Sequence, residues 1–265
     1  PARVRIVNLD SEFGTELAAR CSGDVITVST RFDRVANGRP HVFVRSVVAR
    51  QQGSEIGLQT SWGEARVFVP LVGDFNVANS VLVLAYLLSY DIELADACAA
   101  LEAVNAPPGR MQRVDAPAGP TVFIDYAHTP NALEVALRAL RLHTQGRLHV
   151  VFGCGGDRDT GKRPLMARIA ERLADRVVIT SDNPRFESPA RIIDDIVDGL
   201  ARPHAATVIE DRAAAIAWAI ANAAGEDEVL IAGKGHENYQ IIGDERIAFS
   251  DYGAAFGNLA TEATE

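Results

Sequence analysis

Four consecutive residues, Asp182-Asn183-Pro184-Arg185, combine an anion, an amide, a fixed backbone angle and a guanidinium. An aspartate and an asparagine can together hold an ammonium group, and an arginine can bind a carboxylate through two parallel hydrogen bonds. Proline fixes φ and so limits how the loop can move. The segment therefore fits a zwitterion such as an amino acid. A polar turn at a strand end is an equally good interpretation, because Asn-Pro is a common turn signal.

A glycine-rich segment, Gly153-Cys-Gly-Gly-Asp-Arg-Asp-Thr-Gly161, superficially matches a phosphate-binding loop. The dinucleotide fingerprint requires glycine at its first, third and sixth positions, and the sixth position here is Arg158. The nucleotide phosphate loop requires Gly-Lys followed by Ser or Thr, whereas Gly161-Lys162 is followed by Arg163. Both motifs fail. What remains is a loop that offers Arg158 to an anionic group, or a tight strand-to-helix turn with solvated charges.

Three further sets of polar residues could contribute to the same site. Gly233-Lys-Gly-His-Glu237 could supply backbone donors and a carboxylate to a bound amine, or form a glycine turn with a surface lysine and glutamate. Asp125 and His128 could contact a ribose or a transferring group, although a single histidine is more often structural. Arg110 could reach a phosphate or simply be an exposed arginine.

The elements around these residues place them at strand ends. After residue 105, short apolar strands alternate with helical stretches, which indicates βαβ units and a mostly parallel sheet covered on both faces. Strands are expected at 122–126, 148–152, 177–180, 207–209 and 229–232, helices at 131–142, 163–173, 189–200 and 212–223, and a β-hairpin at 240–249 before a last helix. Ligands bind at the carboxyl ends of such strands, and four of the polar segments follow four of them. We therefore expect these segments to share one sheet edge.

The first part of the chain has a different pattern. Strands are expected at 4–9 and 25–30, with a helix at 11–21 between them, and β-rich runs at 41–50, 54–61 and 65–72 indicate an antiparallel meander, followed by helices at 76–90 and 94–104. Asn105-Ala-Pro-Pro-Gly109 interrupts this pattern and is the best linker in the chain. The sequence therefore predicts two α/β domains, 1–105 and 106–265.

The composition excludes several classes of protein. The 265 residues are 48% hydrophobic and 23% charged, as in globular proteins. The net charge of −9 disfavours a generic nucleic-acid or anionic-membrane binder, which would normally be basic. The longest apolar run, 81–88, is far shorter than the roughly 20 residues of a membrane helix. Three scattered cysteines predict a reduced, intracellular protein, and the N-terminus lacks a signal peptide and has the pattern of a strand entered in mid-domain.

Taken together, these segments resemble the Mur ligase family, the ATP-dependent amide-bond ligases of peptidoglycan precursor synthesis. Gly73-Asp-Phe-Asn-Val-Ala-Asn79, Pro108-Gly-Arg110-Met and Asp125-Tyr-Ala-His-Thr-Pro130 match general family motifs. The segments 153–159 and 233–237 resemble the members that add the third residue of the stem peptide. Asp182-Asn-Pro-Arg185 is similar to the members that add meso-diaminopimelate, whereas lysine-adding members usually lack this arginine.

The resemblance covers nearly the whole chain and implies a role for each matching residue. Asn79 would contact the adenine end of ATP, Arg110 the phosphates, and Asp125 and His128 would help to orient the nucleotide. The diaminopimelate pocket would consist of Arg158, Asp182, Asn183, Pro184, Arg185, Gly233 and Glu237. The resemblance assigns no catalytic residue and no metal ligand within the chain.

The fold implied by the resemblance is a Rossmann-like C-terminal domain at 106–265, preceded at 1–105 by the latter part of an α/β ATPase domain. The implied activity is a cytoplasmic, ADP-forming ligase that uses ATP and Mg²⁺ to join meso-diaminopimelate to UDP-MurNAc-L-Ala-D-Glu through an acyl phosphate. The family's phosphate loop, magnesium ligands and carbamylated lysine are expected upstream of Pro1, so the chain alone is expected to be an inactive fragment. The alternatives are a lysine-adding homologue, a non-catalytic nucleotide- or amino-acid-binding module, and an oxidoreductase, which the broken glycine fingerprint disfavours.

Overall fold

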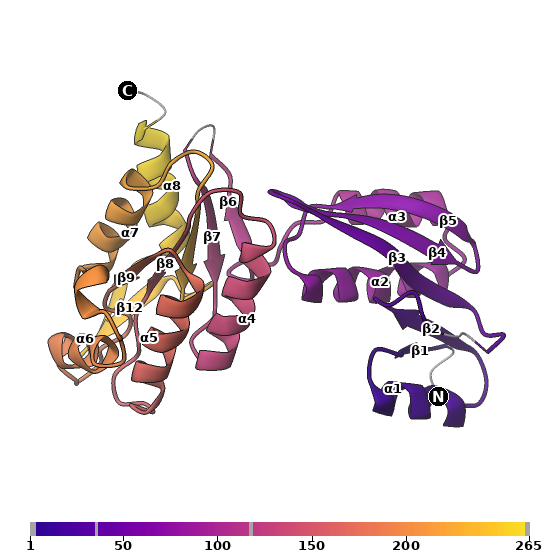
Figure 1. The fold of residues 1–265 in the computed structure, drawn as a ribbon, viewed down its shortest axis with the longest axis horizontal. Coiled ribbons are helices and arrows are strands. Elements are labelled where there is room, and N and C mark those ends of the chain that lie inside the picture. The colour runs from indigo at the N-terminus through magenta and orange to yellow at the C-terminus, as the bar shows by residue number, and fades with distance from the viewer. Residues whose placement is uncertain (1–3, 35–36, 117–118, 263–265) are drawn as a thin grey trace. The chain divides into compact units, whose positions relative to one another are not determined.

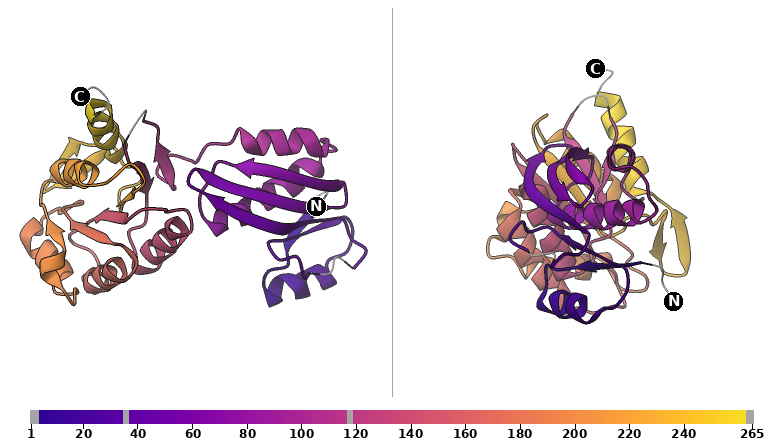
Figure 2. Two further views of the ribbon diagram at one scale, coloured as in Figure 1. Left: turned by 45° about the horizontal axis from the view of Figure 1, so that its top comes forward. Right: turned by 90° about the vertical axis from the view of Figure 1, so that its right-hand side faces the viewer.

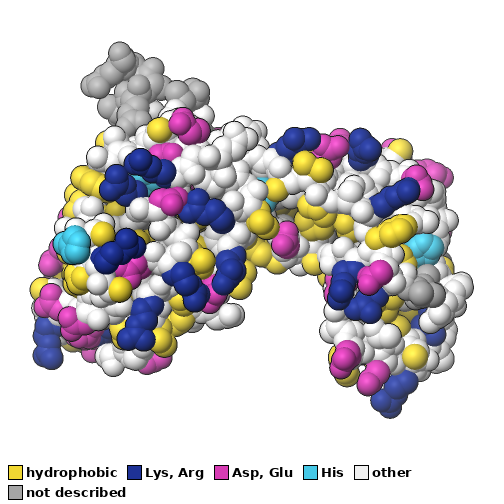
Figure 3. Space-filling view, in the orientation of Figure 1, with side chains coloured by type: hydrophobic (Ala, Val, Ile, Leu, Met, Phe, Trp, Pro, Cys, Tyr) yellow, Lys and Arg dark blue, Asp and Glu magenta, His cyan; other side chains and the backbone are white. Residues whose placement is uncertain are grey.

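The chain divides into two compact units, Pro1–Asn105 and Ala106–Glu265 (Figure 1). The computed structural model describes residues 4–34, 37–116 and 119–262. Each unit has its own sheet and its own helices. Charged side chains of both signs are scattered over the face shown in Figure 3. Within the described ranges, no helix combines the length and the apolar character that crossing a membrane requires.

A five-stranded sheet with the order β1-β2-β3-β4-β5 forms the centre of the first unit. The strands β1 (Arg5–Asn8), β2 (Val25–Ser29) and β3 (His41–Arg50) are parallel. The strands β4 (Gly53–Thr60) and β5 (Gly63–Val69) continue from β3 as an antiparallel meander. This confirms the meander that the β-rich runs predicted.

Helices cover both faces of this first sheet. On one face, α2 (Asp74–Leu88) and α3 (Leu94–Glu102) bury a large apolar cluster that includes Leu84. On the other face, α1 (Glu12–Arg20) packs Ala18 against β1 and β2. Alternate residues of β2 enter the two clusters, as the period of a strand requires.

The second unit has a six-stranded sheet with the order β10-β9-β8-β11-β7-β6. Its strands are β6 (Gln112–Val114), β7 (Thr121–Asp125), β8 (Leu148–Phe152), β9 (Arg176–Ile179), β10 (Thr207–Val208) and β11 (Glu228–Ala232). Only β6 runs antiparallel to its neighbour, so the predicted Rossmann-like, mostly parallel sheet is confirmed. The sequence pattern missed β6, because its three residues carry too short an alternation to be recognised beside the Pro-Pro-Gly segment.

Five helices cover the two faces of this second sheet (Figures 1 and 2). On one face lie α4 (Pro130–Arg141), α5 (Lys162–Leu173) and α6 (Pro189–Val197), and on the other lie α7 (Arg212–Ala221) and α8 (Asp251–Glu262). The short 3₁₀ turn Pro203–Ala205 precedes β10. The helix predicted at 189–200 ends earlier, because Gly199 and Leu200 donate to carbonyls only three residues back.

A hairpin of β12 (Tyr239–Ile242) and β13 (Glu245–Ala248) forms a separate two-stranded sheet, as predicted. It is bonded to the loop after β9. The Arg185 N–H donates to the Ile241 carbonyl (3.0 Å), and the Gly243 N–H donates to the Arg185 carbonyl (2.7 Å). The hairpin therefore holds the backbone of the loop that the sequence singled out first.

Glu228 opens the central strand β11 and is completely buried. Its Oε2 accepts a hydrogen bond from Thr144 Oγ1 (2.7 Å), while its Oε1 has no partner among the described residues. Burial raises the pKa of Glu228 to about 7. Because the folded state holds this proton more tightly than the unfolded chain does, stability from this group is greatest at low pH and is lost as the pH rises through 7.

We therefore expect Glu228→Gln to stabilise the fold more at pH 8 than at pH 5. The shift corresponds to a difference of roughly 2 kcal/mol between the two pH values. Thermal unfolding of the chain at each pH measures it, and the exposed neighbouring variant Glu226→Gln serves as the control. A gain in Tm that is equal at pH 5 and pH 8 would contradict the assignment.

Candidate functional site

A cavity of about 490 Å³ opens at the carboxyl edge of the second sheet. Its walls are the segments that follow β7, β8, β9 and β11. The lining residues are Tyr126, His128, Thr129, Gly155, Arg158, Asp159, Lys162, Asp182, Asn183, Arg185, Gly233 and Glu237. The four polar segments therefore do share one edge, as the sequence predicted. The switch in strand order, with β11 inserted between β8 and β7, lies at the same place.

Seven of the residues singled out from the sequence line this cavity: His128, Arg158, Asp182, Asn183, Arg185, Gly233 and Glu237. Pro184 is buried next to them but does not line it. Asp125 and Arg110 belong to the same unit and lie outside the lining set. Asn79 is an exposed residue of α2 in the first unit, where its Nδ2 donates to Asn76 Oδ1 (3.3 Å).

A buried ammonium lies among the acidic residues of the cavity. Lys234 is fully buried, and its Nζ donates to Asp182 Oδ1 (3.1 Å) and Asn183 Oδ1 (2.8 Å) and lies 3.5 Å from Glu237 Oε2. Asn183 Nδ2 donates to the same Glu237 oxygen (2.9 Å). The sequence interpretation of a surface lysine was therefore wrong. Two flanking glycines do not reveal on which side of the backbone a lysine lies.

These bonds change what Asn183 can offer a ligand. Its Oδ1 accepts from Lys234 Nζ and from the Ile241 N–H (3.0 Å), so both lone pairs are used. The network also fixes the orientation of the amide, because two donors face the oxygen and a carboxylate faces the nitrogen. Only the second N–H of Asn183 remains, which suits an anion. The ammonium contact predicted for Asn183 differs from this arrangement, whereas Asp182 Oδ2 and Glu237 Oε1 have no hydrogen-bond partner among the described residues.

Arg185 holds its guanidinium at the cavity from a backbone in the left-handed region, with φ at 54°. Its Nη1 donates to the Gly156 carbonyl (2.8 Å). The hairpin bonds to its backbone N–H and C=O stabilise this uncommon conformation. The side chain is half-buried, so the remaining guanidinium donors can reach a carboxylate in the cavity.

The glycines of the segment after β8 serve backbone packing. A side chain at Gly156 would overlap the carbonyl oxygen of Pro184, and one at Gly153 would overlap that of Thr180. The Gly156 N–H donates to the Asn183 carbonyl (2.9 Å). The failure of both phosphate-binding motifs in this segment is consistent with this packing, and Arg158 does face the cavity as predicted.

A second buried cation, Arg163, stabilises the loops that follow β8 and β9. Its guanidinium bonds both oxygens of Glu187 (2.6 and 2.7 Å) and Asp195 Oδ2 (2.7 Å). Glu187 Oε2 also accepts from the Asp157 N–H (3.2 Å). The hydrogen bond from Arg163 lowers the pKa of Glu187, so this carboxylate stays ionised and ties the loop after β8 to the loop after β9.

His128 and Lys162 form another part of the cavity lining. Lys162 Nζ donates to the His128 carbonyl (2.8 Å), and His128 Nδ1 lies 2.8 Å from the Tyr126 carbonyl. Because a carbonyl can only accept, Nδ1 carries the proton and Nε2 of the neutral ring is an acceptor. The His128 ring packs edge-on against Tyr126, 4.5 Å between centroids. This wall therefore presents one fixed ammonium and one imidazole nitrogen.

Asp125 and Arg110 are connected through backbone and ring contacts. Asp125 Oδ2 accepts from the Met111 N–H (2.8 Å), and burial raises the pKa of Asp125. The Arg110 guanidinium lies over the Tyr126 ring, 5.1 Å from its centroid. Asp125 thus anchors the start of the 110–112 segment, and Tyr126 connects Arg110 to the cavity wall.

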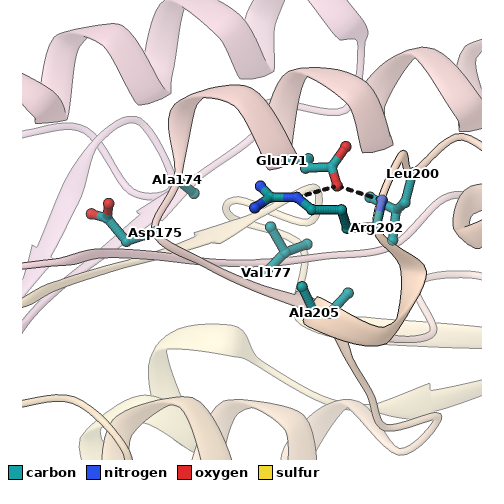
Figure 4. Close-up of a pocket in the computed structure, with 8 residues that line it drawn as sticks. Glu171, Ala174, Asp175, Val177, Leu200, Arg202 and Ala205 are labelled. Atoms are coloured by element: carbon teal, nitrogen blue, oxygen red, sulfur yellow. Dashed lines mark hydrogen bonds and ion pairs between the residues drawn. The ribbon is translucent and has the colours of Figure 1, made fainter.

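A smaller hollow of this unit has no comparable chemistry. It measures about 40 Å³, which is room for about one water molecule. Glu171, at this hollow, accepts a hydrogen bond from the Arg202 N–H (2.8 Å) and pairs with the Arg202 side chain at 3.6 Å (Figure 4). It also accepts from the Ala201 N–H (2.9 Å). Within the described residues, no group of three His, Cys, Asp or Glu side chains could hold a metal ion.

Sequence reasoning missed Lys234 and Lys162 as functional candidates. A compositional signal could have found them, because only two of the 26 basic residues are lysines and both lie at this cavity. Reasoning from motifs treated Lys162 only as a failed phosphate-loop position. The rarity of lysine elsewhere in the chain is the more informative observation.

Comparisons with known proteins agree with this geometry. A family model described as "Mur ligase, glutamate ligase domain" matches residues 109–235. The chain is 44% identical over 249 residues to a UDP-N-acetylmuramoyl-L-alanyl-D-glutamate–2,6-diaminopimelate ligase from Haemophilus influenzae, covering 94% of this chain and 51% of that protein. It is 46% identical over 262 residues to the protein of the same name from Pseudomonas putida, covering 97% of this chain and 53% of that protein. The chain thus spans about half the length of these curated relatives.

Solved structures give the same result. A structure of a ligase with that name superposes with a TM-score of 0.78 at 33% identity, covering 99% of this chain and 53% of the other. A folylpolyglutamate synthase from Mycobacterium tuberculosis, complexed with ADP, shares only the fold, with a TM-score of 0.59 at 21% identity over 88% of this chain and 61% of that one. The α/β units and the pocket-forming loops agree with these matches, and residues 109–235 of the second unit form a Mur ligase, glutamate ligase domain.

Proposed function

We propose that this chain supplies the amino-acid pocket of a cytoplasmic, ATP-dependent ligase that joins meso-diaminopimelate to UDP-MurNAc-L-Ala-D-Glu. One observation carries the proposal. Arg185, Asp182 and Glu237 converge on one cavity in a chain that is 44–46% identical to ligases of that name. Because the chain spans about half of those relatives, the activity is proposed for a protein that also contains the remaining parts.

The charges of the cavity suit diaminopimelate, which carries an ammonium and a carboxylate at each end. Asp182 Oδ2 and Glu237 Oε1 are available for an ammonium. Arg185 and the free N–H of Asn183 are available for the carboxylate of the same end. Lysine lacks that carboxylate, so it would leave the Arg185 guanidinium partly desolvated and unpaired. The pocket therefore favours diaminopimelate over lysine.

The proposed reaction has two steps. The γ-phosphate of ATP is transferred to the D-glutamyl carboxylate, giving an acyl phosphate and ADP, and the amine of diaminopimelate then attacks the acyl carbon and expels phosphate. The contribution of the cavity is to hold the amino acid so that its amine is oriented for this attack. Arg158 and Lys162 add positive charge to the lining of the cavity.

Three residues are proposed to contact the nucleotide, and a fourth to act on it indirectly. Arg110, whose guanidinium lies over the Tyr126 ring, would reach the phosphates, and Asn79 the adenine end. His128 presents its Nε2 and would orient the nucleotide together with Asp125. Asp125 would act through the backbone of Met111, to which it is bonded. The described residues offer no cluster for Mg²⁺, so no step is assigned to a metal held by this chain.

The first prediction concerns selectivity. Arg185→Ala should weaken the binding of meso-diaminopimelate by roughly 10- to 100-fold, because a hydrogen bond to a charged group contributes about 1.5–3 kcal/mol. Binding of L-lysine should change little. Titration calorimetry on the 265-residue chain measures both, and Arg176→Ala, at the opposite end of β9, is the matched control. An unchanged ratio of the two affinities would place the selectivity elsewhere.

The second prediction concerns turnover. Phosphoryl transfer depends on positioning and on neutralising charge, and the described residues contain no group of three His, Cys, Asp or Glu side chains that could hold a metal ion for the latter. We therefore expect the 265-residue chain to release no ADP above background when it is mixed with ATP, Mg²⁺, UDP-MurNAc-L-Ala-D-Glu and meso-diaminopimelate. A coupled ADP assay checks this. A rate on the order of 1 s⁻¹, typical of enzymes, would contradict it.

A further inference from the structure

Lys234 is unusual both in the sequence and in the structure. It is one of two lysines among 26 basic residues, and its side chain is completely buried. Elsewhere in the described part of the second unit, buried positive charge is supplied by arginine, as at Arg163 and Arg212. Lys234 therefore provides a compact ammonium at a buried position, whereas Arg163 and Arg212 provide a guanidinium.

The backbone around Lys234 forces its side chain inward. Gly233 and Gly235 have φ values of 119° and 55°, which side chains rarely adopt. A Cβ at Gly235 would also lie 2.7 Å from Tyr126 Cβ. Backbone bonds from Gly233 N–H to the Asp125 carbonyl (3.0 Å) and from Glu237 N–H to the Lys234 carbonyl (3.0 Å) hold the turn. The Gly-Lys-Gly sequence thus serves to direct one lysine beneath the cavity.

The ammonium is surrounded by three acceptors and an aromatic ring. Its three acceptors are Asp182 Oδ1, Asn183 Oδ1 and Glu237 Oε2, at 3.1, 2.8 and 3.5 Å. The Tyr239 ring of the hairpin lies 5.8 Å away. Another buried cation, Arg212, donates to both oxygens of Asp251, and no hydrogen bond joins it to these carboxylates among the described residues. A buried charge requires such partners, and here all three ammonium donors have one.

We propose that Lys234 is a positioning residue that decides which ligand groups the cavity accepts. It occupies one oxygen of Asp182, one of Glu237 and the oxygen of Asn183, and leaves one carboxylate oxygen on each acid. Two carboxylates and one ammonium carry a net charge of −1, which matches a single ligand ammonium. The cavity therefore takes the zwitterionic end of an α-amino acid, with its ammonium on the acids and its carboxylate on Arg185. The inference deepens the proposed function and rests on it for the identity of the ligand.

Arginine would not replace Lys234 in this role. A guanidinium is planar and larger, and its donors point in a fixed fork, whereas the three acceptors here converge on one point. Lys234→Met keeps the length of the side chain and removes the ammonium. Lys234→Arg keeps the charge and changes the shape. Comparison of the two variants separates charge from geometry.

The first test uses the wild-type chain and needs no ligand. Labelling lysine with ¹⁵N at Nζ gives two side-chain signals, one from Lys162 and one from Lys234. We expect one ammonium in slow exchange with water, absent from Lys234→Met and retained in Lys162→Arg. An ammonium of Lys234 that exchanges as fast as that of Lys162, or that is methylated by formaldehyde and borohydride at the same rate, would overturn the proposal.

The second test is a stability cycle with Asp182→Asn. In the wild type this change removes an ion pair and should lower Tm. In the Lys234→Met background it removes one of two neighbouring carboxylates, the buried Asp182 and the partly buried Glu237, that lack their ammonium partner, so Tm should rise. Thermal unfolding of the four proteins measures the reversal of sign. If the decreases in Tm caused by Asp182→Asn and by Lys234→Met simply add in the double variant, Lys234 acts by packing alone.

The third test measures binding of meso-diaminopimelate by calorimetry. Lys234→Met and Lys234→Arg should each bind at least tenfold more weakly than the wild type, while Arg176→Met keeps the wild-type affinity. Equal affinities of wild type and Lys234→Met would overturn the inference and leave the proposed function intact. Absence of binding by the wild type would instead contradict the proposed function. The ¹⁵N signals of the lysine ammonium groups and the stability cycle would then still decide the role of Lys234.

Discussion

The candidate site depends on buried cations that join two strands that are not neighbours. β9 and β11 are separated in the sheet by β8, so no ladder hydrogen bond connects their carboxyl ends. Arg212 bridges them by donating to the carbonyls of Ser181 (3.3 Å) and Ala232 (3.0 Å), while Asp251 neutralises its charge. Lys234 bridges the next residues of the same two strand ends through Asp182.

This bridge explains why the segment after β8 is rich in glycine. That segment leaves the sheet between the carboxyl ends of β9 and β11, where there is space for a backbone but not for large side chains. Gly153 and Gly156 lie against the backbone of the loop after β9, with no space for a Cβ. The glycines of the segment 153–161, which does not match a phosphate loop, therefore allow close backbone packing. This packing brings Arg158 and the Gly156 carbonyl to the cavity.

The hairpin adds a constraint on the same loop. Its strand β12 bonds the backbone of Arg185 on both sides, and the Ile241 N–H bonds the Asn183 amide. The loop after β9 is thus held by the hairpin on one side and by Lys234 and Arg163 on the other. Side chains held in this way keep their geometry before a ligand arrives, which reduces the entropy lost on binding. The chain is also 44–46% identical to diaminopimelate ligases, and the proposed function assigns these rigid side chains to an amino-acid pocket.

Much of this organisation could be derived from the sequence. Apolar runs separated by helical spacing predicted the parallel sheet, and the position of polar segments after strands predicted a shared edge with Asp182, Arg185 and Glu237 on it. These predictions succeed because strand period and strand ends are local properties of the chain. The short β6 escaped detection because local patterns need more than three residues.

What only the tertiary structure decided was which oxygen of each side chain is already used. Lys234 bonds residues 52 and 51 positions away, and Asn183 bonds Glu237 54 positions away. Sequence spacing carries no information about such contacts, so it could not show that Lys234 is buried or that the Asn183 amide oxygen is filled. The residue types alone determined that the site is charged and polar. The fold decided which of these groups are free to bind a ligand, because the buried ammonium of Lys234 already occupies some of the neighbouring oxygens.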